Sequence, residues 1–184
     1  IMLTAAHPPK GQSDGEQLAV IRLQRLAAMA DYPAALDLLS VMPRQGRGEG
    51  LLRAEAELRF LSGDHIAACS LVSAEVLRSQ AEFWQKAMVF CQILSGDLGK
   101  AELGLTLLRE VGSNDPEFFA LADAMVADVP YQNADLSQSS PLTLAMLLKV
   151  KFSVKLATLV DMSPGGLRVV ALAENQPIGL RLLA

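Results

Sequence analysis

Residues 61–64 of the chain read Leu-Ser-Gly-Asp, and the same four residues return 33 positions later at 94–97. A weaker copy, Ala-Met-Ala-Asp, stands another 33 positions upstream at 28–31. In every copy the Asp is followed four positions later by Ala. A fixed interval of this size is typical of repeat architectures, in which one supersecondary unit is stacked several times. The sequence therefore predicts an array of similar units.

The residues of the repeated phrase indicate a tight turn between two helices. Gly63 and Gly96 suit the left-handed position just past a helix end. The Asp side chain suits the N-cap of the next helix, where a carboxylate accepts free backbone N–H groups. These aspartates are Asp31, Asp64 and Asp97. The small Ala one turn later allows two antiparallel helices to approach closely. These alanines are Ala35, Ala68 and Ala101.

This pattern resembles the tetratricopeptide repeat, a helix–turn–helix unit of about 34 residues. The matching residues belong to the turn and to the start of the second helix. They are Gly63, Asp64 and Ala68, then Gly96, Asp97 and Ala101, with Asp31, Tyr32 and Ala35 in the first copy. The resemblance covers about residues 16–127. It implies an all-α fold, a right-handed α-solenoid of antiparallel helical hairpins, and a protein-binding or scaffolding role.

Helical periodicity gives the expected boundaries of the hairpins. Phe83, Ala87, Phe90 and Leu94 share one helix face, and Trp84 is expected in the core beside them. We expect helices at 16–29 paired with 33–42, 50–61 paired with 64–78, and 81–94 paired with 98–110. A further helix is expected at 116–127. Runs of β-branched residues are scarce, which disfavours strands.

The remaining segments read as a flexible leader at 1–15, a linker loop at 128–140 and a C-terminal helical cap at 141–184. Ser140-Pro141 is a strong helix start, because a capping hydroxyl precedes a Pro at the first helical position. The helix is expected to run to about Val150, or on to Leu159. Further short helices are expected at 167–173 and after Pro177. We expect this cap to pack on the end of the array and to be truncated, because both chain ends read as cut.

The two cysteines, Cys69 and Cys91, each lie 11 residues from Gln80, where the turn between their helices is expected. Positions at equal distance from a hairpin turn face each other, so the two thiols are either bridged or packed as small apolar side chains. A bridge would place the protein in an oxidising compartment such as a bacterial periplasm; without it, the expected location is cytoplasmic. His65 and Cys69 are also spaced by four residues, but a structural zinc site needs four ligands. We expect no metal ligands, and His65 is expected to face solvent.

Composition and motifs narrow the function classes. The net charge of −4 lacks the basic surface expected of a nucleic-acid-binding protein. The most apolar stretch, residues 142–160, is interrupted by Lys149, Lys151 and Lys155, so membrane insertion is not expected. We interpret this stretch as a packed helix with a lysine face; the alternative is an amphipathic helix on an anionic surface. There is no phosphate-binding loop or serine nucleophile motif, so no cofactor, catalytic residue or enzyme activity is expected.

The leading hypothesis is therefore a protein–protein interaction or scaffolding module with a protein or peptide partner. The alternatives are a helical accessory region of a larger enzyme and a structural spacer in a bacterial envelope protein. The groove of such an array is built from its first helices, whose polar positions include Arg22, Arg25, Arg53, Arg59 and Gln85. Glu55, Glu57 and the arginines near the Gly46–Gly50 turn are interpreted as solvated charge. The sequence does not indicate an oligomeric state.

Overall fold

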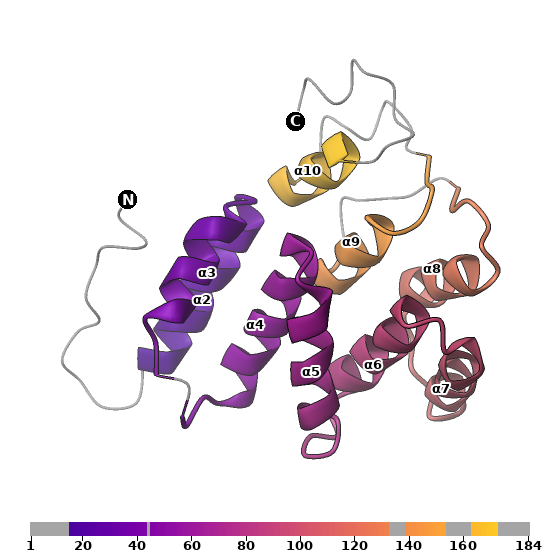
Figure 1. The fold of residues 1–184 in the computed structure, drawn as a ribbon, viewed down its shortest axis with the longest axis horizontal. Coiled ribbons are helices and arrows are strands. Elements are labelled where there is room, and N and C mark those ends of the chain that lie inside the picture. The colour runs from indigo at the N-terminus through magenta and orange to yellow at the C-terminus, as the bar shows by residue number, and fades with distance from the viewer. Residues whose placement is uncertain (1–14, 44, 133–138, 154–162, 173–184) are drawn as a thin grey trace.

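The structure of the protein is a computed structural model that describes residues 15–43, 45–132, 139–153 and 163–172. Regular secondary structure in these ranges is entirely helical, apart from one isolated parallel bridge between Tyr131 and Phe152. The all-α prediction is confirmed. The helices, labelled in Figure 1, are α2 (Gly15–Ala28), α3 (Tyr32–Ser40), α4 (Glu49–Ser62), α5 (His65–Glu75), α6 (Glu82–Leu94), α7 (Leu98–Glu110), α8 (Pro116–Val126), α9 (Pro141–Leu147) and α10 (Pro164–Leu172).

The repeated phrase forms the turn inside each pair of helices. Gly63 and Gly96 have φ angles of 86° and 77°, in the left-handed region that glycine adopts at low cost. Ala30 adopts the same conformation in the first copy, with a φ of 57°. The carboxylates of Asp31 and Asp64 each accept a backbone N–H at 3.3 Å, from Ala34 and Ala67 respectively, and so cap α3 and α5.

Asp97 stands at the N-cap of α7 but makes no capping hydrogen bond with its side chain. Its carboxylate instead pairs with the Nζ atom of Lys100 at 2.5 Å. The predicted position is right, while the predicted capping bond is replaced by an ion pair on the surface.

The repeated alanines lie in the core. Ala35, Ala68 and Ala101 are fully buried. The largest buried side chains, Phe60, Trp84, Phe90 and Phe118, are also fully enclosed. Small side chains at the helix contacts let the backbones approach, and the aromatic rings fill the space between successive pairs.

Each second helix packs between two first helices. In order along the chain, α3 contacts α2 and α4, α5 contacts α4 and α6, and α7 contacts α6 and α8. First helices also touch one another, α2 with α4 and α6 with α8. Successive pairs therefore lie side by side, as Figure 1 shows from indigo α2 to salmon α8.

The C-terminal helices differ from the predicted terminal cap. Helix α9 packs against α4 and α8, and α10 packs against α9 and α2, so both lie along one side of the array (Figure 1). The predicted start of α9 is confirmed: Ser140 Oγ accepts the N–H of Thr143 at 3.2 Å, and Pro141 follows it. All six residues from Leu142 to Leu147 are buried. A helix without a polar face must be covered on several sides, which the end of an array cannot provide.

Helix α9 ends at Leu147 rather than near Val150. The alternative extension to Leu159 was wrong as well, because residues 148–153 are not helical and Phe152 forms a bridge with Tyr131. The interpretation of residues 142–160 as one packed helix with a lysine face fails for the same reason. The leader and the helix predicted after Pro177 lie outside the described residues.

A disulfide between Cys69 and Cys91 joins α5 to α6, with the two Cα atoms 5.6 Å apart. This separation is within the usual range of about 4.4–6.8 Å. The prediction that the two thiols face each other across the turn is confirmed.

Arg47 and His65 were expected in solvent, but the polar atoms of both are largely enclosed, so these predictions were wrong. The Arg47 side chain is 6% exposed; it pairs with Glu55 and donates to the carbonyl oxygens of Leu39 and Met42, both at 3.0 Å. It therefore anchors the segment that follows α3 to α4. Both ring nitrogens of His65 are buried without a hydrogen bond among the described residues.

Candidate functional site

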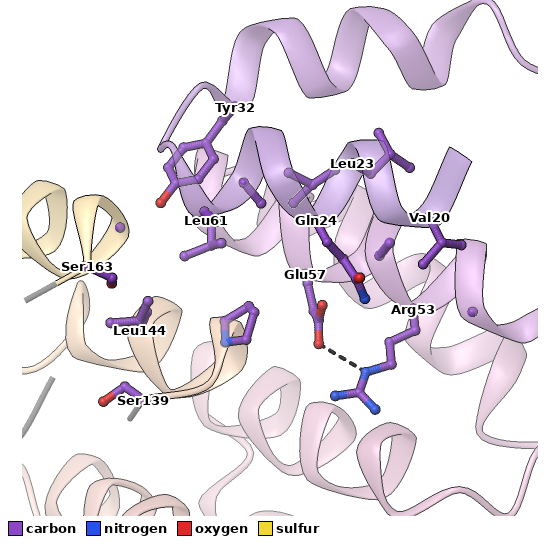
Figure 2. A pocket seen from close by; sticks show the side chains of 17 residues that line it. Val20, Leu23, Gln24, Tyr32, Arg53, Glu57, Leu61, Ser139, Leu144 and Ser163 are labelled. Carbon is purple, nitrogen blue, oxygen red and sulfur yellow. Dashed lines mark hydrogen bonds and ion pairs between the residues drawn. The ribbon is translucent and has the colours of Figure 1, made fainter. Parts of the chain in front are cut away.

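A pocket of about 590 Å³ lies where α9 and α10 meet α2 and α4. Figure 2 shows it from close by. Ligand sites in proteins typically measure about 300–1,000 Å³, so the pocket is large enough for a small molecule or a short peptide segment.

The walls of the pocket are mostly aliphatic. They include Leu23 of α2, Leu58 and Leu61 of α4, and Leu144 of α9. These side chains have packing partners on one side and the pocket on the other. Val20, Ala27, Ala54 and Pro141 complete the apolar lining.

A carboxylate and a guanidinium stand together in this apolar setting. Glu57 is only 8% exposed, and its Oε1 atom accepts a hydrogen bond from Arg53 Nε at 3.0 Å. The two residues are four positions apart on α4, which places them on one helix face. Burial raises the pKa of the Glu57 carboxyl, and the charge and hydrogen bond of Arg53 oppose that increase.

The Arg53 side chain is 52% exposed, and its guanidinium lies over the ring of Phe83, 4.6 Å from the centroid. This stacking holds the guanidinium at the edge of the pocket, beside Glu57 (Figure 2). Gln24 of α2 points toward the same pair.

The opposite end of the pocket is formed by Tyr32 and the start of α10. Tyr32 is 2% exposed, and its hydroxyl points toward Ser163. Burial raises the pKa of this hydroxyl, while the nearby charge of Arg168 lowers it. Ser163 Oγ accepts the N–H of Gly166 at 3.1 Å and so caps α10. This end therefore offers a neutral phenol and a capped helix start.

Arg168 fixes α10 against the first hairpin. Its guanidinium lies 4.9 Å from the centre of the Tyr32 ring, and its Nη1 atom donates to the carbonyl oxygen of Ala30 at 3.3 Å. Gly165 of α10 packs near Leu144 of α9, since a Cβ atom built on Gly165 would stand 3.6 Å from Leu144 Cδ1, at ordinary contact distance. The wall contributed by α10 is thus held by contacts to both α2–α3 and α9.

The structure also bears on the metal, thiol and membrane hypotheses that the sequence raised. Cys69 is bonded to Cys91, so it presents no thiolate to a metal or to a neighbouring His65. Among the described residues, no three His, Cys, Asp or Glu side chains gather in a way that could hold a metal ion. No helix in the described ranges is long and apolar enough to cross a membrane.

The repeat-defining aspartates, glycines and alanines lie in turns and between helices, and none of them lines the pocket. Of the five polar residues predicted on first helices, Arg53 lines the pocket. Glu57 was expected on a solvated face, and this prediction was wrong. The spacing of Arg53 and Glu57 among the leucines and alanines of α4 was the signal that could have identified the pair.

No protein-family model matches the chain, and no curated protein or solved structure is significantly similar to it.

Proposed function

We propose that the protein is a protein–protein interaction or scaffolding module, built as a right-handed α-solenoid of tetratricopeptide-like hairpins. The pocket between α2, α4, α9 and α10 receives a peptide segment of the partner. The neighbour-to-neighbour packing of the hairpins and the left-handed turns at Ala30, Gly63 and Gly96 support the architecture. The disulfide supports work in an oxidising compartment, such as a bacterial periplasm.

The observation that carries the binding function is the combination of aliphatic walls with one buried, hydrogen-bonding pair. Pockets that bind peptides or small molecules are mostly apolar and contain a few polar groups that fix orientation. A helical spacer has no need for an open cavity of this size, because filling it with side chains would stabilise the fold.

The test is a selection from a random peptide display library, followed by affinity measurements with purified variants. Ala28 lines the pocket and is exposed, so Ala28→Trp should obstruct the pocket without disturbing the core. The selected peptides should bind Ala28→Trp at least about tenfold more weakly than the wild type, a loss of about 1.4 kcal/mol. Ala74→Trp, at an exposed position of α5 outside the pocket, is the matched control and should bind as the wild type does. Equal binding to all three proteins, or a selection that yields no peptide, would reject the proposed site.

A further inference from the structure

We infer that the pocket recognises an uncharged main-chain amide flanked by an aliphatic side chain, and discriminates against charged groups of either sign. This inference rests on the proposed function and names the chemistry of the segment that the pocket receives. It follows from the hydrogen-bonding capacity that Glu57 and Arg53 do not use within the protein, from their opposite charges and from the aliphatic lining of the pocket.

Glu57 leaves acceptor capacity in the pocket. A carboxylate can accept about four hydrogen bonds. Only Oε1 of Glu57 has a hydrogen-bond partner among the described residues, namely Arg53 Nε. One hydrogen bond does not fully offset the desolvation cost of a buried carboxylate. A ligand N–H that donates to Oε2 therefore contributes favourably to the free energy of binding.

Arg53 leaves donor capacity beside that oxygen. Its hydrogen bond to Glu57 uses Nε, and in the described part of the chain the two Nη groups donate no hydrogen bond to the protein. Stacking on Phe83 fixes the plane of the guanidinium at 4.6 Å from the ring centre. Hence one open acceptor and a set of open donors stand side by side, which matches the N–H and C=O groups of a peptide.

The opposite charges of Arg53 and Glu57 disfavour a charged ligand of either sign. A carboxylate ligand attracted by Arg53 meets the negative charge of Glu57, and an ammonium ligand attracted by Glu57 meets the positive charge of Arg53. The Glu49 carboxylate also interacts with the charge of Arg53, but it already accepts hydrogen bonds from Ser79 and Trp84 and does not line the pocket. Because the pair lies in a partly desolvated setting, a like charge close to either group is costly. A neutral amide avoids both penalties.

The walls select what flanks the amide. Val20 and Ala27 of α2 contribute a half-buried aliphatic lining, whereas the leucines that line the pocket, Leu23, Leu58, Leu61 and Leu144, are buried. At the far end, the pocket offers only neutral polar groups, the Tyr32 hydroxyl and Ser163. An aliphatic side chain next to the bound amide removes the half-buried side chains of Val20 and Ala27 from water, whereas a polar side chain does not gain that free energy.

The test measures binding of four probes to the whole chain by methyl NMR titration of Ala27 and Leu144. The neutral probe is N-acetyl-leucyl-leucine N-methylamide. The anionic probe is N-acetyl-leucyl-leucine, and the cationic probe is leucyl-leucine N-methylamide. The fourth probe, N-acetyl-glutaminyl-glutamine N-methylamide, carries neutral amides without aliphatic side chains. We expect the neutral leucine probe to bind at least about tenfold more tightly than the other three, because like-charge contacts and uncovered apolar walls each cost that much or more.

Two variants then shift the selectivity in opposite directions. Glu57→Gln keeps an acceptor and nearly the same volume, so the neutral probe should stay within about threefold of the wild type, while the anionic probe gains about tenfold. Arg53→Gln changes a half-exposed side chain and should favour the cationic probe by a similar factor. Glu110→Gln, on the exposed face of α7, is the control and should change nothing.

A charged probe that binds the wild type as tightly as the neutral one overturns the inference. So does equal binding of the glutamine probe, or a Glu57→Gln variant with unchanged charge preference. If none of the probes shifts the methyl signals of Ala27 or Leu144, the inference also fails. The effect of Ala28→Trp on selected peptides would still stand as a separate test of the proposed function.

Discussion

Replacing Gly104 by Ala should destabilise the protein, although alanine is the better helix former. Gly104 lies in α7 where it crosses α6, and a Cβ there would stand 2.7 Å from Val89 Cγ2. Val89 is 2% exposed and β-branched, so its methyl group has no open rotamer to move into. Overpacking of this kind costs about 1–3 kcal/mol. The gain in helix propensity is about 1 kcal/mol, which leaves a net loss of about 1 kcal/mol.

Gly99 provides a matched control in the same helix. A Cβ at this position meets no atom within 4 Å, so Gly99→Ala should stabilise the protein by up to about 1 kcal/mol. Urea denaturation of both variants should therefore separate their free energies of unfolding by about 2 kcal/mol. In a Val89→Ala background the clash is gone, and Gly104→Ala should become stabilising, with a coupling energy of about 2 kcal/mol. Equal stabilisation by both glycine replacements would refute the close approach of α6 and α7.

Three further predictions concern the disulfide, a buried histidine and a packed alanine. Replacing both Cys69 and Cys91 by Ser should lower the free energy of unfolding by about 3 kcal/mol, because the bridge closes a loop with a sequence separation of 22. Urea denaturation measures this difference. An unchanged free energy of unfolding would mean that the thiols are not bridged in the purified protein. Burial and the charge of Lys149 lower the pKa of His65, so the folded state binds fewer protons than the unfolded state. The free energy of unfolding should therefore reach its full value above about pH 6.5 and decrease as the pH falls below that value. His65→Leu should remove part of this decrease, which denaturation curves at several pH values would measure. Ala101→Leu should cost about 1–3 kcal/mol by overpacking, whereas Ala5→Leu in the N-terminal leader should leave the denaturation midpoint unchanged.

The local features of the fold were predictable because local chemistry determines them. A glycine in the left-handed region, an Asp before a helix and a Pro at the first helical position each act within a few residues. The Cys69–Cys91 pair was predictable because a hairpin relates positions at equal distances from its turn. Asp97 shows the limit of such rules, since Lys100 competes for the carboxylate that would otherwise cap α7.

The pocket could not be predicted, because it depends on where α9 packs. Nothing in the sequence near residue 141 indicates that this helix lies against α4, more than 70 residues earlier in the chain. Once α9 and α10 cover that face, Glu57 changes from a surface charge into a buried one. Periodicity identifies which residues share a helix face, while the covering element decides whether that face meets water.

The position of the C-terminal helices also changes how the protein is expected to unfold. A linear array in which each unit touches only its neighbours frays from its ends, and its stability is a sum of local terms. Here α9 joins α4 to α8, and α10 joins α9 back to α2, so contacts close a ring around the array. The first hairpin cannot open without breaking that ring. The backbone amides of α2 should therefore exchange with solvent at rates set by global unfolding, and the whole described array should melt in a single cooperative transition.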